Sequence, residues 1–126
     1  MTPAYWCIVI AAALIYACTG LAKAGGRMSP RANNAPRAWL DQLEGWPQRA
    51  HWAQLNGFEV FPIFAAAVLV AQTSHATQTR IDTLAECFIG FRLLYIAMYL
   101  ADQATLRTLT WIGGMVCCGW LFVLAA

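Results

Sequence analysis

Four long apolar segments constrain the fold of this chain more than any other feature of its sequence. A helix needs about 20 mostly apolar residues to cross the hydrocarbon core of a bilayer. Residues 5–22, 47–72, 84–100 and 106–124 satisfy this requirement. No segment shows the sustained alternation of apolar and polar residues that is typical of membrane β-strands. The sequence therefore predicts an all-α integral membrane protein, a four-helix bundle that forms one domain over residues 1–126.

Composition supports the lipid bilayer as the solvent of this chain. Apolar residues make up 60% of the 126 residues and charged residues 11%, whereas an average soluble domain has about 25% charged residues. The net charge of +2 is too sparse for a nucleic-acid-binding surface, which shows a dense basic stripe. The five cysteines lie in apolar stretches without a CxxC spacing. We expect them to be small structural hydrophobes with no metal-binding role.

Positive charge is distributed unevenly between the segments that join the spans. The long loop 23–46 carries four Lys and Arg residues, and Arg49 and Arg107 lie close to the same side, whereas the loop after the second span carries only Arg80. Lys and Arg are enriched in cytoplasmic loops. We therefore expect the loop 23–46 to face the cytoplasm and both termini to lie on the opposite side.

The loop 23–46 also has a candidate helix of its own. Proline favours the first position of a helix and glycine the position after its end, which predicts a short helix from Pro36 to Gly45. Trp39, Leu40 and Leu43 then share one face. A plain surface loop is the alternative.

Polar residues interrupt the second span. Arg49, Asn56 and Glu59 fall on one helical stripe together with Trp52, whereas His51 points elsewhere. Glu59 lies about 15 Å along the axis from Arg49. A charged side chain near the bilayer centre costs about 2.5–3.5 kcal/mol, so Glu59 needs a partner or a wet cavity. The proline three residues later is expected to kink the helix and open room there.

The third span offers that partner. Arg92, Tyr95 and Tyr99 share one face, and Arg92 reaches a depth similar to that of Glu59 because the two spans run antiparallel. We therefore expect Glu59 and Arg92 to form an ion pair. The alternative is that these polar groups only hold neighbouring helices together. In the fourth span, the spacing of Gly114 and Cys118 predicts close helix packing.

These residues predict a pocket on one side of the membrane. Its cations are Lys23, Arg49, Arg92 and Arg107, and its other polar groups are Asn56, Glu59, Tyr95 and Tyr99. Guanidinium groups bind carboxylates and a glutamate binds an amine. The pocket therefore suits a small polyanion that also carries an amine.

The motifs resemble those of the MAPEG family, the membrane-associated proteins in eicosanoid and glutathione metabolism. The stretch from Gln54 to Pro62, QLNGFEVFP, resembles the second-helix motif of this family. Arg92 to Tyr99, followed by Arg107, resembles the third-helix and fourth-helix motifs. The resemblance covers nearly the whole chain and implies a homotrimer with glutathione sites that lie between subunits and face the cytoplasm.

The resemblance also implies individual roles for the pocket residues. Asn56 and Glu59 match glutathione-binding positions, Tyr95 and Tyr99 match paired tyrosines, and Arg107 matches the arginine that stabilises the glutathione thiolate. Lys23 supplies a cation where the leukotriene synthases have arginine.

Two departures from the family pattern affect the site. Trp52 stands where the enzymes often have an arginine, so either Arg49 replaces that arginine or one carboxylate contact is lost. The spacing from Tyr99 to Arg107 is one residue longer than in the leukotriene synthases, so the direction of the Arg107 side chain does not follow from the resemblance.

The resemblance implies a glutathione-dependent transferase or peroxidase that acts on a small hydrophobic electrophile. A non-catalytic lipid or protein binder of the same family is the first alternative. The second is a structural membrane protein whose polar stripes only set the helix register.

Overall fold

The computed structural model describes residues 1–126 as an all-helical bundle without strands. Four helices are long and apolar enough to cross a membrane, which confirms the all-α, four-span prediction. They are α1 (Pro3–Gly25), α3 (Gly45–Gln72), α4 (Gln78–Leu100) and α5 (Ala104–Ala125). Each helix extends beyond its expected range, most of all α4, because its first turns are helical but polar and so lie outside the apolar segment.

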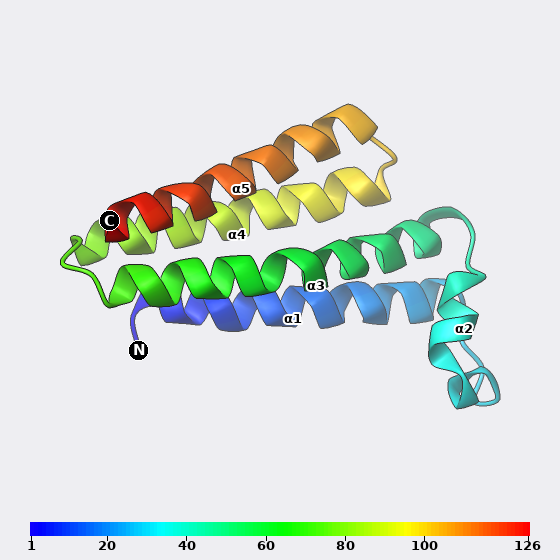
Figure 1. Ribbon diagram of the computed structural model, residues 1–126. Helices are drawn as coiled ribbons and strands as arrows, with labels where there is room; N and C mark the ends of the chain where they lie inside the picture. The colour runs from blue at the N-terminus through cyan, green and yellow to red at the C-terminus, as the bar shows by residue number, and fades with distance from the viewer.

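Successive long helices run antiparallel, with α1 beside α3 and α4 beside α5 (Figure 1). Both termini and the turn between α3 and α4 lie at one end of the bundle, which we call the terminal end (Figure 1). The short helix α2 and the turn between α4 and α5 lie at the other end, the α2 end (Figure 1). This arrangement places loop 23–46 and Arg107 at the same end.

The connection from α1 to α3 contains a 3₁₀ turn, Ala32–Asn34, and α2, Pro36–Asp41. The expected helix therefore begins at Pro36 but stops at Asp41, because Gly45 adopts a φ of 66° and begins α3 instead of ending α2. The expected apolar face is confirmed: Leu40 is buried, and Trp39 and Leu43 pack against the same cluster.

Two helices that finish at the α2 end stop in the same way. Arg27 and Asp102 follow α1 and α4 with φ values of 56° and 59°, in the left-handed region. The next N–H then reaches back to a carbonyl in the last turn, from Met28 to Lys23 at 3.0 Å and from Gln103 to Met98 at 2.9 Å. This motif satisfies carbonyl groups that the end of a helix leaves without partners.

The apolar core occupies the half of the bundle nearer the terminal end. Phe64 of α3 and Phe88 of α4 stack at its centre, with ring centroids 3.8 Å apart and planes 7° apart. Gly114 and Cys118 are buried where α5 packs against α3 and α4, as their spacing predicts. Four of the cysteines are buried and Cys87 is exposed.

Two further residues of α3 shape the middle of the bundle. A Cβ atom added at Gly57 would lie 2.8 Å from Cγ1 of Ile15, so only glycine lets α1 approach α3 this closely. Pro62 lies inside α3, which continues through it as one helix, and its ring is exposed; the kink stays a prediction.

Candidate functional site

Arg92 and Glu59 are connected through Asn56 and do not form the direct ion pair that the sequence suggests. The Nη1 group of Arg92 donates to Oδ1 of Asn56 at 2.9 Å, and Nδ2 of Asn56 donates to Oε2 of Glu59 at 3.3 Å. The helical spacing gives only the depth of Glu59 and Arg92 along the helix axes. Arg92 is 7% exposed whereas Glu59 is exposed, so an amide spans the radial distance between them.

Aromatic rings continue this polar path toward the α2 end. Cζ of Arg92 lies 4.3 Å from the ring centroid of Tyr95, and Cζ of Arg107 lies 4.5 Å from that of Tyr99. The two tyrosine rings meet edge to face at 5.5 Å. Cation–π contacts at these distances are attractive, so each tyrosine orients one arginine of the site.

Two adjacent hollows open along α3, α4 and α5, and they share Asn56, Tyr95 and Tyr99. The first adds Trp52, Leu55 and Glu59. The second adds Arg107, Thr108 and Trp111. We call the two hollows together the polar groove.

The helical register explains why these side chains meet. Asn56 and Glu59 are three residues apart on α3, and Tyr95 and Tyr99 are four apart on α4, so each pair shares a face of its helix. The polar groove therefore brings together five of the predicted site residues. They are Asn56, Glu59, Tyr95, Tyr99 and Arg107. Arg92 lies behind them and touches the groove through Asn56.

Arg49 and Lys23 are not part of the polar groove. Nε and Nη2 of Arg49 donate to the carbonyl oxygen of Leu100 at 3.3 and 3.1 Å. Arg49 thus holds the last turn of α4, where carbonyl groups lack helical partners. Lys23 lies in the last turn of α1 and lines neither hollow. Neither cation therefore lines the groove of the single chain, and their part in a site between subunits stays a prediction.

Trp52 lines the polar groove, and Arg49 does not take its place there. Its side chain is 42% exposed, and its ring centroid lies 6.3 Å from that of Tyr99. Because Arg49 is engaged with Leu100, an aromatic ring and no cation borders this part of the groove.

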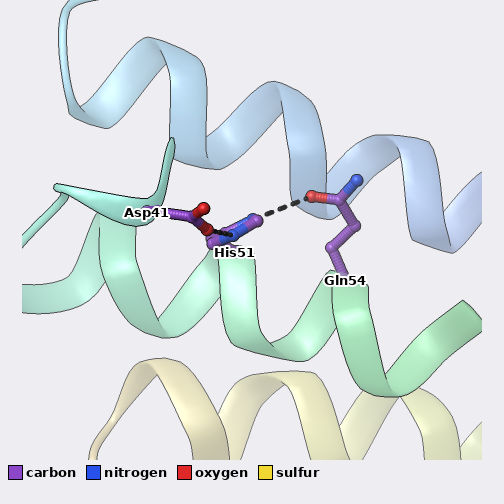
Figure 2. A network of polar contacts seen from close by, with 3 residues as sticks. All are labelled: Asp41, His51 and Gln54. Carbon is purple, nitrogen blue, oxygen red and sulfur yellow. Dashed lines mark hydrogen bonds and ion pairs between the residues drawn. The ribbon is translucent and has the colours of Figure 1, made fainter. Parts of the chain in front are cut away.

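A second polar cluster lies on another side of α3 (Figure 2). His51 is 6% exposed, its Nδ1 lies 3.2 Å from Oε1 of Gln54, and its Nε2 lies 3.2 Å from Oδ1 of Asp41. We call these three residues the His51 cluster. It links α2 to α3 and lines neither hollow. The sequence places His51 off the polar stripe, but nothing in the spacing identifies Asp41 as its partner.

The charges of the polar groove define what it can bind. The groove is lined by the guanidinium group of Arg107 and the carboxylate of Glu59, and the guanidinium group of Arg92 is buried behind it. Arg107 takes part in no ion pair. A guanidinium group without a counter-ion is suited to bind a carboxylate or phosphate through two parallel hydrogen bonds. The groove therefore suits a small anion that also carries a cationic group.

Comparison with known proteins connects this geometry to a family. No curated protein matches the chain. A sequence model of the MAPEG family matches residues 3–126. That range includes all four long helices and every residue of the polar groove. The chain therefore belongs to the MAPEG family, as its motifs predict, and its four apolar helices are those of a multi-pass membrane protein.

Proposed function

We propose that the protein is a membrane-bound, glutathione-dependent transferase or peroxidase that acts on an apolar electrophile. The observation that carries the proposal is the polar groove, which holds an unpaired arginine, Arg107, and an exposed carboxylate, Glu59, on either side of Asn56, Tyr95 and Tyr99. Glutathione carries two carboxylates and one ammonium group. Glu59 is complementary to the ammonium group and Arg107 to an anionic group of this ligand.

Each groove residue has a role in this proposal. Arg107 stabilises the thiolate of glutathione, because a nearby cation lowers the pKa of a thiol from its ordinary value of about 8.5. Tyr99 holds Arg107 in place through the contact between ring and guanidinium group. Glu59 binds the ammonium group, and Asn56 contacts the peptide while it orients Glu59.

Glutathione supplies the nucleophilic sulfur in this reaction, so no cysteine of the protein is required. In conjugation, a C–S bond forms as the bond to the leaving group breaks, the leaving group departs with the electron pair, and the thiol proton passes to solvent. In reduction of a lipid hydroperoxide, two glutathione molecules are oxidised to the disulfide, and the hydroperoxide yields an alcohol and water. The hydrophobic substrate enters from the bilayer.

A homotrimer is part of the proposal. Glu59 lies halfway along α3 and its side chain is exposed in the single chain. A charge left against hydrocarbon at that depth costs about 2.5–3.5 kcal/mol. A neighbouring subunit that covers the polar groove removes this cost and supplies further cations.

We also propose that the polar groove is reached from the cytoplasm. It opens toward the α2 end, where most of the Lys and Arg residues lie, and such residues favour the cytoplasmic side of a membrane. Both termini then lie on the opposite side.

The proposal is tested by measuring conjugation of glutathione to an aryl halide by the purified full-length protein in detergent. We expect a rate well above that of protein-free micelles, together with thermal stabilisation by glutathione, since a ligand that binds only the folded state stabilises it. Glu59→Gln should weaken this stabilisation, whereas Arg49→Ala should leave it largely intact, since Arg49 contacts Leu100. The absence of both rate and stabilisation would contradict the proposal.

A non-catalytic lipid or protein binder is the second candidate. It is favoured by Trp52, an exposed aromatic residue that borders the polar groove where the family's enzymes often have a cation. Stabilisation by glutathione without turnover of any electrophile would support this candidate. It would also separate the binding role of the groove from its catalytic role.

A further inference from the structure

A second groove lies between α4 and α5 at the terminal end, the opposite end from Arg107 and α2. One part of its wall is polar and belongs to the first turns of α4, and the other part is apolar and belongs mainly to α5. The polar residues are Thr79, Arg80 and Thr83, and the apolar residues are Leu84, Trp120 and Leu124. We call it the Arg80 groove.

Arg80 has no counter-ion within the chain. It takes part in no hydrogen bond or ion pair through its side chain, and it is the only Lys or Arg at the terminal end. The nearby carboxylate of Asp82 is engaged elsewhere, since its Oδ1 accepts from the backbone N–H of Ala4 at 3.0 Å and from Nε2 of Gln78 at 2.8 Å. The guanidinium group is therefore available for an external anion.

In the apolar wall of the Arg80 groove, Leu84 and Leu124 are half-buried and Trp120 is exposed. Trp120 is 55% exposed, and no other helix of the chain covers it. Because α4 begins and α5 ends at this level, the polar wall lies where a membrane-spanning bundle meets the lipid headgroups. A ligand of the groove must therefore combine an anionic group with an apolar chain.

We propose that the Arg80 groove binds one anionic phospholipid, with its phosphate on Arg80 and Thr79 and an acyl chain along Leu84, Trp120 and Leu124. The planar guanidinium group binds phosphate oxygens through two parallel hydrogen bonds. Thr79 offers a hydroxyl donor, whereas the hydroxyl of Thr83 already donates to the carbonyl of Thr79 at 2.8 Å. This site is separate from the polar groove and independent of glutathione.

The experiment counts lipids bound to the full-length protein by native mass spectrometry. Phosphatidylglycerol and phosphatidylcholine with identical acyl chains are compared as probes. We expect tighter binding of the first phosphatidylglycerol, and Arg80→Gln should weaken it at least about fivefold, a loss expected for one basic residue at an anionic surface. Arg37→Gln, which changes an exposed arginine at the α2 end, should leave it unchanged.

Two further arms separate this site from its alternatives. Trp120→Ala, at an exposed position outside the core, should weaken phosphatidylglycerol binding by removing the acyl contact. Displacement of the lipid by millimolar inorganic phosphate would indicate a free-anion site and overturn the lipid assignment. Equal affinity for the two lipids, or equal losses in the two arginine variants, would overturn the proposal altogether.

Discussion

His51 and Gln54 on one side of α3 find their polar partners within the chain, whereas Glu59 on another side of the same helix is exposed. His51 is buried, Gln54 is half-buried and Asp41 is exposed, and the cluster borders neither hollow. The polar groove opens outward between α3, α4 and α5, with Arg107 unpaired at its border.

The difference between these regions separates two reasons for placing polar groups in an apolar bundle. A buried polar group that is fully hydrogen-bonded holds elements together. A charged group that is left partly unsatisfied at membrane depth is costly, so it points to a ligand or a partner subunit. The His51 cluster fits the first case and the polar groove the second.

The largest expected effect is in the polar groove. Arg107→Ala should lower the rate of glutathione conjugation by about 100-fold or more, the usual consequence of removing a donor that stabilises developing or resident negative charge. The measurement is kcat/KM with glutathione and an aryl halide. Arg37→Ala is the matched control and should retain full activity. A fully active Arg107→Ala variant would remove this residue as the thiolate partner.

The second prediction concerns the residue that joins Arg92 to Glu59. Asn56→Leu leaves Nη1 of Arg92 without its acceptor, which should lower the free energy of unfolding by about 1–3 kcal/mol. Asn56→Asp keeps an oxygen at that place and should be less destabilising. Thermal unfolding in detergent measures both variants. Equal stability of Asn56→Leu and the unmodified protein would show that Asn56 does not satisfy Arg92.

The third prediction adds a cation to the polar groove. Trp52→Arg should tighten glutathione binding about tenfold, because a hydrogen bond to a charged group contributes about 1.5–3 kcal/mol. Trp46→Arg serves as the control, since Trp46 is exposed in the first turn of α3 and lies outside the groove. Isothermal titration compares the two. Weaker binding in Trp52→Arg would mean that the aromatic ring itself contacts the ligand.

The smallest effect is expected in the His51 cluster. His51→Leu removes the contacts to Asp41 and Gln54 and should lower the free energy of unfolding by about 1 kcal/mol. Glutathione affinity should not change, because these residues line neither hollow. A loss of affinity at unchanged stability would show that the two regions of α3 are coupled.

The sequence alone predicted much of the site but not its connections. Asn56, Glu59, Tyr95 and Tyr99 follow from helical spacing and Arg107 from its side of the membrane and the family resemblance, and the structure brings all five to one groove. The direct contact between Glu59 and Arg92 was wrong, because spacing measures position along a helix and not how far each side chain lies from the bundle axis.

The partners of Arg49 and His51 were also beyond the sequence. Arg49 binds the end of α4, 51 residues away in the chain, and His51 binds a residue of α2. Such contacts depend on where two helix ends meet, and no local pattern records that.

Four apolar segments, their polar stripes and the bias of positive charge are properties of the chain itself, because the length and periodicity of a helix follow from local composition. Which cations remain free was decided by the packing of the helices. Arg49 donates hydrogen bonds to a carbonyl group at the end of α4, whereas Arg107 and Arg80 form no ion pair. Short-range polar contacts depend on ångström-scale distances between side chains, and only the tertiary structure determines those distances.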